Sequence, residues 1–190
     1  MPPTDDPVAR ILSLYAETGH RDYLGEPVSQ LEHAAQTADC ALAGGHDDEV
    51  VCAAFLHDIG HLCSTDAERM GRWGAAGHEA LGARYLRTLG FGEAVTHLVE
   101  GHVAAKRYLT FSQPEYYERL SEASKATLRH QGGPMSAAEA QAFESNPLFS
   151  RILELRTWDE AAKVPGQPVS LKKYEAVLRR YWDSRSGTDG

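Results

Sequence analysis

The segment 53-AAFLHDIGHLC-63 carries three side chains that can bind a metal or transfer protons at the end of an apolar run. His57 and Asp58 are adjacent, and His61 follows about one helical turn after His57. Because burying such polar groups costs free energy, their place in an apolar segment indicates a function. The spacing differs from that of zinc fingers, which need paired cysteines, and from that of His-Glu-x-x-His proteases. The sequence therefore predicts a metal site of another kind.

Further candidate ligands occur on other predicted helices, on or beside the face that each helix turns inward. The full set is His33, His57, Asp58, His78, His102 and Asp159. Facing helices of a bundle can bring such groups to one central site, and nitrogen and oxygen ligands without thiolate suit iron or manganese better than structural zinc. Six ligands are too many for one ion that must also bind substrate, so we expect two metals. Asp58, about 100° around the helix from His57, is the candidate bridge.

The helices that must position these groups are predicted from apolar residues at helical spacing and from capping signals. Capping boxes begin at Ser29 and Ser136, and Gly44-Gly45 ends a helix. The expected helices cover residues 7–18, 30–43, about 48–58, 78–89, 91–109, 115–131 and 136–144, then a stretch from Asn146-Pro147 through Asp159, and finally 170–182. A glycine-rich loop around Trp73 precedes His78. No segment shows strand-like alternation, so the fold class is an all-α bundle.

Composition limits the class of protein further. The 190 residues, 42% of them hydrophobic, suit one domain over 1–190 with its core at about 8–182. A net charge of −8 argues against binding to nucleic acid or to anionic membranes, and no stretch is apolar enough for a membrane span or a signal peptide. Three cysteines without a C-x-x-C pair fit a reducing cytoplasm. The sequence predicts a soluble cytoplasmic protein and indicates no oligomeric state.

The order H…HD…D, with extra histidines before the last aspartate, resembles the dinuclear members of the HD-domain superfamily. Within that superfamily the chain resembles the mixed-valent diiron oxygenases of phosphonate catabolism. The matching blocks are 22-DYLGE-26, 30-QLEH-33, 54-AFLHDIGH-61, 100-EGHVAAKRYL-109, 131-QGGPM-135 and 156-RTWDE-160. The similarity spans about residues 8–182 and includes positions of both the metal site and the substrate site. The resemblance predicts an HD-domain helical bundle with a central dinuclear site.

The resemblance implies two iron ions, Fe(II) and Fe(III) in the active state, with O2 as co-substrate. One ion would be held by His33, His57, Asp58 and Asp159, and the other by Asp58, His78 and His102. It implies further that Tyr23 ligates the second iron when substrate is absent, with Glu26 as its companion. The loop between Tyr23 and Glu26 suits such a movement.

The resemblance also implies contacts to substrate. His61 and Lys106 match a phosphonate-contacting pair, and each follows a metal ligand by about one helical turn, so both share the metal-facing side of their helices. Ser124 and Arg156 lie where further polar support is expected. A primary amine or trimethylammonium end would suit Glu26 with the face of Tyr23. The implied reaction cleaves the C–P bond of a 1-hydroxy-2-(amino or trimethylammonio)ethylphosphonate with O2, giving phosphate and glycine or glycine betaine.

Two other functions use the same scaffold. HD phosphohydrolases hydrolyse nucleotides or small phosphate esters with a metal-activated water, and a mononuclear enzyme of this kind would leave His78 and His102 without a role. A non-catalytic HD module that senses a ligand or binds a partner would be expected to lack one or more ligands, and none is missing here. The sequence does not settle which substituent the substrate nitrogen carries.

Overall fold

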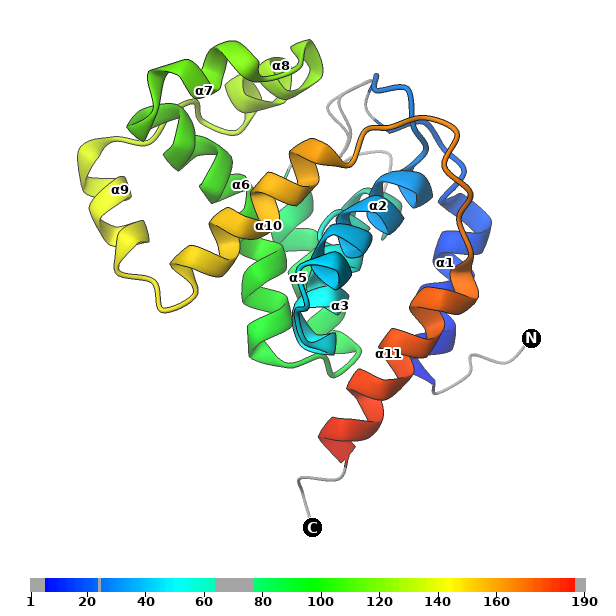
Figure 1. The fold of residues 1–190 in the computed structure, drawn as a ribbon. Helices are drawn as coiled ribbons and strands as arrows, with labels where there is room; N and C mark the ends of the chain where they lie inside the picture. The colour runs from blue at the N-terminus through cyan, green and yellow to red at the C-terminus, as the bar shows by residue number, and fades with distance from the viewer. Residues whose placement is uncertain (1–5, 24, 64–76, 187–190) are drawn as a thin grey trace.

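The computed structural model describes residues 6–23, 25–63 and 77–186, and its regular elements are helices (Figure 1). Apart from one isolated β-bridge between Asp22 and Ser29, these residues form no strand. The predicted all-α fold is therefore confirmed. The glycine-rich loop predicted around Trp73 lies outside the described residues, and the single domain expected over 1–190 stays a prediction.

The described part of the chain contains eleven helices. In chain order they are α1 (Pro7–Thr18), α2 (Gln30–Ala43), α3 (Asp48–Leu56), α4 (Ile59–Cys63), α5 (His78–Thr88), α6 (Glu93–Ser112), α7 (Pro114–Arg119), α8 (Glu122–His130), α9 (Ala137–Glu144), α10 (Phe149–Ala161) and α11 (Leu171–Ser186). The short helix α3 is central: it packs against α2, α6 and α11, and every side chain from Val50 to Leu56 is buried. In Figure 1, α7, α8 and α9 lie on the side of the molecule away from α1 and α11.

Side-chain caps explain several helix boundaries. The Ser29 hydroxyl accepts from the Glu32 amide, and the Glu32 carboxylate accepts from the Ser29 amide, so the predicted capping box of α2 is present. Ser136 and Glu139 form the same arrangement at α9. Each such cap stabilises a helix by about 1 kcal/mol. The predicted bounds 7–18 and 30–43 agree with α1 and α2 because these helices carry strong end signals.

The single helix predicted over 115–131 is wrong, since the structure has α7 and α8 there. Leu120 is extended, with ψ of 141°, and the Ser121 hydroxyl caps α8 by accepting from the Ser124 amide at 3.1 Å. Ser121 therefore starts a new helix inside a segment whose apolar spacing looks continuous. The break allows α8 to turn Ser124 and Thr127 toward the pocket described below.

Other helix boundaries also differ from prediction. The helix expected to open at Asn146-Pro147 begins at Phe149, because Asn146 accepts from the Leu148 amide at 2.8 Å in a turn that precedes the helix. The last helix runs to Ser186 rather than to 182, and α6 covers 93–112 rather than 91–109.

None of the described helices combines the length and the apolar character needed to cross a membrane.

Gly60 sets the distance between α4 and α5. A Cβ atom at this position would lie 1.9 Å from the His78 carbonyl oxygen and 2.9 Å from the Gly82 amide nitrogen. Both are backbone atoms and cannot rotate away, so only glycine permits this approach. The contact fixes the start of α5, and thus His78, against the turn that carries Asp58.

Candidate active site

The structure brings the six predicted ligands together from five parts of the chain. They are His33 on α2, His57 and Asp58 in the turn between α3 and α4, His78 at the start of α5, His102 on α6 and Asp159 on α10. All are buried, and none is more than 5% exposed. Two groups of three have ligand atoms within 4.8 Å of one another, and Asp58 belongs to both.

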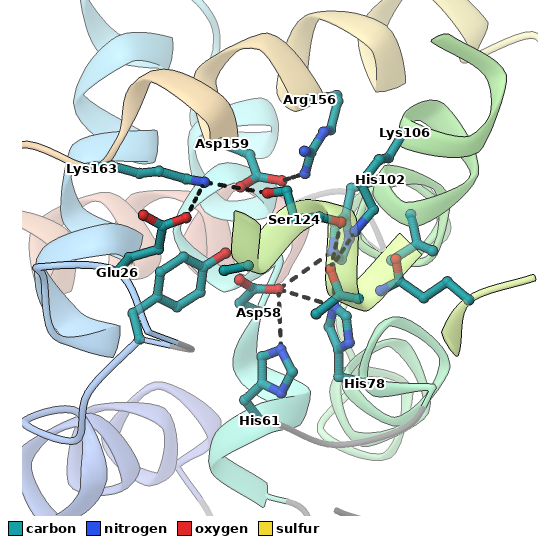
Figure 2. Close-up of a pocket in the computed structure, with 15 residues that line it drawn as sticks. Glu26, Asp58, His61, His78, His102, Lys106, Ser124, Arg156, Asp159 and Lys163 are labelled. Carbon is teal, nitrogen blue, oxygen red and sulfur yellow. Dashed lines mark hydrogen bonds and ion pairs between the residues drawn. The ribbon is translucent and has the colours of Figure 1, made fainter. Parts of the chain in front are cut away.

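The Asp58 carboxylate lies between these two groups. Its Oδ2 is 3.3 Å from His57 Nε2 and 3.5 Å from His33 Nε2. Its Oδ1 is 3.2 Å from His78 Nε2 and 3.4 Å from His102 Nε2, contacts that Figure 2 shows as dashed lines. Asp159 joins the first group, with Oδ1 3.4 Å from His33 Nε2. This is the geometry that a bridging carboxylate requires.

Backbone carbonyls fix which ring nitrogen of three histidines faces the centre. The Nδ1 atoms of His33, His57 and His102 lie 2.9, 2.9 and 2.7 Å from carbonyl oxygens, which are those of Ala162, Ala54 and Val99. A carbonyl oxygen only accepts, so each Nδ1 carries a proton. In the neutral imidazole the Nε2 lone pair then points into the site. Such second partners are typical of metal-binding histidines.

The facing imidazole nitrogens show that the residues fit metal ions. His33 Nε2 lies 3.1 Å from His57 Nε2, and His78 Nε2 lies 3.1 Å from His102 Nε2. Two nitrogen lone pairs at this distance repel unless a proton or a metal cation lies between them. With two carboxylates beside them, both groups offer the nitrogen and oxygen donors that first-row divalent metals prefer.

Opposing effects act on the pKa values of the central groups. Burial raises the pKa of Asp58, but the charge of His57 and hydrogen bonds from His102 and His33 outweigh burial and hold it well below its usual value. Burial lowers the pKa of His33, whereas Asp159 and Asp58 raise it, to about 9 overall, so without a metal this ring also carries a proton on Nε2, which a bound metal ion would replace. The carboxylates are therefore ionised and concentrate negative charge where a cation would bind.

A pocket opens beside Asp58. The predicted substrate-contacting residues all line it, and these are Tyr23, Glu26, His61, Lys106, Ser124 and Arg156. Figure 2 shows Glu26 on one side of Asp58 and Lys106 on the other. The structure therefore gives the pocket two chemically different ends with the predicted metal ligands between them.

Lys106 is a buried lysine, 4% exposed. Its ammonium donates to Thr127 Oγ1 at 2.9 Å, and the ion pairs of the described residues include no carboxylate partner for it. Burial and the nearby charge of Arg156 lower the pKa of Lys106 to about 7. A lysine in this position gains most from an anionic ligand, because a ligand anion would supply the missing countercharge.

Arg156 is bound chiefly to protein groups. Its Nη1 donates to Asp159, and its Nε lies 2.9 Å from Glu160 Oε1 and 3.0 Å from the Tyr116 hydroxyl. Its Nη2 is buried and has no hydrogen-bond partner among the described residues. Arg156 thus orients Asp159 and leaves its Nη2 amino group without a partner among the described residues, beside the pocket.

Tyr23 and Glu26 lie in the short loop before α2. The Tyr23 ring stacks on the His33 imidazole, with centroids 3.8 Å apart and planes 13° from parallel. Burial, followed by the charges of Asp58 and Asp159, raises the pKa of the Tyr23 hydroxyl well above its usual value. The hydroxyl is therefore neutral in this environment. The Glu26 amide donates to the Tyr23 carbonyl at 2.7 Å, which links the two residues in one turn.

Three polar pocket residues were not singled out from the sequence: Thr127, Gln131 and Lys163. Lys163 follows Asp159 by four positions, the spacing that linked Lys106 to His102, but it lies past the end of α10, where that rule no longer applies. Gln131 belongs to the matching block 131-QGGPM-135 but received no role. Thr127 carries no sequence signal, because its place depends on the start of α8 at Ser121.

Comparison with known proteins agrees with this geometry. The HD domain family matches residues 30–146. The chain belongs to the HD-domain family. A glycine-betaine-forming 1-hydroxy-2-(trimethylamino)ethylphosphonate dioxygenase of Leisingera caerulea is 44% identical over 151 residues, which are 79% of this chain and 76% of that protein. The predicted resemblance to HD-domain oxygenases of phosphonate catabolism is therefore confirmed.

Two further relatives extend the match over more of the chain. The hydroxymethylphosphonate dioxygenase of Gimesia maris is 39% identical over 177 residues, 90% of this chain and 88% of that protein. An uncharacterised protein of Acanthamoeba polyphaga mimivirus is 41% identical over 177 residues, 92% of this chain and 81% of that protein. The two relatives named as dioxygenases thus act on phosphonates that differ in the group attached to the reacting carbon.

Proposed function

We propose that this protein is an oxygenase that uses O2 to cleave the C–P bond of a small 1-hydroxyalkylphosphonate. The observation that carries the proposal is Asp58, whose two oxygens face two separate ligand groups at the edge of a pocket that also holds Lys106, a buried lysine with no carboxylate partner among the described residues. The names of the Leisingera and Gimesia relatives support the same reaction class.

The proposed reaction balances with one O2 per substrate. A molecule R–CH(OH)–PO3H2 and O2 together become R–COOH and H3PO4. The C–H and C–P bonds of the hydroxyl carbon break, that carbon is oxidised to a carboxylic acid, and O2 is reduced. Glycine, glycine betaine or formate would be formed when R is an aminomethyl group, a trimethylammoniomethyl group or hydrogen.

We propose iron as the metal, with His33, His57, Asp58 and Asp159 holding one ion and Asp58, His78 and His102 holding the other. When bound, an Fe(II)/Fe(III) pair would supply the redox chemistry with O2 and a coordination site for the substrate hydroxyl. The protein's own contribution is to fix the imidazoles through backbone carbonyls, to keep both carboxylates ionised and to enclose the site within the bundle.

The remaining residues are proposed to orient the substrate. Lys106 and His61 would hold the phosphonate, with Ser124 and the Nη2 amino group of Arg156 as additional donors. In a protein of net charge −8, this local set of donors would capture a small anion without general affinity for polyanions. Tyr23 is proposed to ligate the second metal until substrate replaces it, and a cationic amine end would face Glu26.

The decisive experiment measures phosphate release from hydroxymethylphosphonate and from 1-hydroxy-2-aminoethylphosphonate by iron-loaded protein with a reductant. Release should require O2, and an anaerobic sample serves as the control. No release from any 1-hydroxyalkylphosphonate would contradict the proposal. Phosphate release from a phosphate ester without O2, supported by a single Mn, Co or Zn ion, would instead identify an HD phosphohydrolase.

Replacing Lys106 by alanine should raise KM for the phosphonate with a smaller effect on kcat, because the variant loses an anion contact and keeps the metal ligands. A charge-assisted contact of this kind contributes about 1.5–3 kcal/mol, which corresponds to a rise in KM of roughly 10- to 150-fold. Steady-state kinetics with a fixed O2 concentration provides the measurement. Lys173→Ala, at an exposed lysine paired with Asp39, is the control and should retain the wild-type KM. An unchanged KM for Lys106→Ala would exclude this lysine from binding.

A further inference from the structure

The end of the pocket opposite Lys106 is formed by an ion pair between Glu26 and Lys163 (Figure 2). Lys163 lies two residues past the end of α10, and its ammonium is 2.7 Å from Glu26 Oε1. The Ser121 hydroxyl donates to the same oxygen at 2.5 Å. The Glu26 and Lys163 side chains are only 12% and 18% exposed, so solvent screens the pair less than it would on the surface.

Lys163 is also held by other groups at this end. Its Nζ lies 3.3 Å from Ser121 Oγ and 3.4 Å from Ser124 Oγ, so three oxygens from two elements surround the ammonium. Burial raises the pKa of Glu26, but the hydrogen bonds from Lys163 and Ser121 outweigh it and lower the pKa below its usual value. The carboxylate is therefore ionised, and its charge is already matched by a neighbouring cation.

This pairing changes what Glu26 can offer a ligand. A carboxylate without a countercharge would attract the cationic end of a substrate strongly. With Lys163 in contact, a substrate cation would share the Glu26 carboxylate with a second cation. Two like charges bound to one carboxylate in a partly buried site repel each other appreciably. The other carboxylate at this side, Asp159, is likewise paired, with Arg156. A small neutral substituent does not meet this repulsion.

We propose that Lys163 is a specificity-determining residue that ranks substrates by the charge of the group on the hydroxyl carbon. It favours 1-hydroxyphosphonates with a small neutral substituent over those with an ammonium or trimethylammonium end. The inference rests on the proposed function, since it concerns the choice among substrates of that reaction. The residue that sets the substrate preference is then Lys163, which neutralises Glu26, rather than Glu26 alone.

The test compares kcat/KM for hydroxymethylphosphonate with kcat/KM for the 2-amino and 2-trimethylammonio 1-hydroxyethylphosphonates. Wild type should prefer the neutral substrate. Lys163→Gln should raise the ratio of cationic to neutral kcat/KM by about tenfold or more, because it removes the competing charge. Lys163→Arg keeps the charge and should retain the wild-type ratio. Lys125→Gln removes a cation on α8 that pairs with Glu122 outside the pocket, and it should leave the ratio unchanged.

Two outcomes would overturn the inference. One is an unchanged ratio in Lys163→Gln at wild-type metal content; another is a fall in the ratio, which would mean that Lys163 only holds Glu26 in place for a cationic ligand. If Lys163→Gln does not fold, Lys163→Met provides the same comparison. If wild type releases phosphate from none of these substrates, the proposed function fails, and calorimetric binding of the same three phosphonates under anaerobic conditions still tests the ranking through the ratio of Kd values.

Discussion

Asp58→Asn is expected to lower the rate of O2-dependent phosphate release by at least about a thousandfold and to reduce the metal content of the purified protein. Asp58 presents one oxygen to His33 and His57 and the other to His78 and His102. An amide has one acceptor oxygen and an NH2 group, so it can serve one ligand group but not both. Loss of the shared ligand should therefore affect both metal positions at once.

The measurement for Asp58→Asn combines elemental analysis of metal per chain with kcat for a 1-hydroxyalkylphosphonate. Asp39→Asn is the matched control, because Asp39 is a half-exposed carboxylate that bonds Lys173 and Tyr174 away from the site. The control should retain metal and activity. Two metals per chain with wild-type turnover in Asp58→Asn would show that the carboxylate does not bridge.

The metal ligands could be predicted because four of them lie on helices whose inward faces are marked by apolar spacing, and His57 and Asp58 directly follow the apolar run of α3. A histidine such as His78 is ambiguous alone, and only the combination with His57, Asp58 and Asp159 indicates a site. The sequence also predicts that Lys106 shares a face with His102, since the two are one helical turn apart. These inferences depend on helical spacing between residues close together in the chain, and this spacing can be read directly from the sequence.

The Glu26–Lys163 pair could not be predicted in this way. The two residues are 137 positions apart, and Lys163 lies beyond the last residue of α10, where helical spacing no longer fixes the direction of a side chain. Ser121 contributes to the same cluster only because a helix starts there, at a break that the apolar pattern does not reveal. The proposed determinant of substrate preference is therefore a contact between segments far apart in the sequence, which helical spacing does not predict.

Burial of so many charged groups in the bundle serves function better than stability. Arg156, Asp159 and Glu160 form a network with Tyr116, and such buried ion pairs contribute little net free energy of folding because desolvation offsets their attraction. Breaking one partner is costly, however, since the other charge stays buried. The network therefore holds Asp159 in one orientation, as a site with fixed ligand geometry requires.

Gly60→Ala is expected to lower the free energy of unfolding by about 3 kcal/mol or more and to impair metal binding together with it. The added methyl carbon would lie 1.9 Å from the His78 carbonyl oxygen, with the His78 carbonyl carbon at 2.7 Å. These backbone atoms can move only if α4 and α5 separate. Such a shift would carry His78 away from Asp58 Oδ1, which it now approaches at 3.2 Å.

A control variant distinguishes the clash between α4 and α5 from the general cost of replacing a glycine. Gly166→Ala is the control: its φ of +75° disfavours alanine by roughly 1–2 kcal/mol, but nothing lies within 4 Å of the added carbon. Urea unfolding of both variants in excess chelator compares the two costs without the contribution of bound metal. If Gly60→Ala loses no more stability than Gly166→Ala, α4 and α5 are not held at the distance that places His78 beside Asp58.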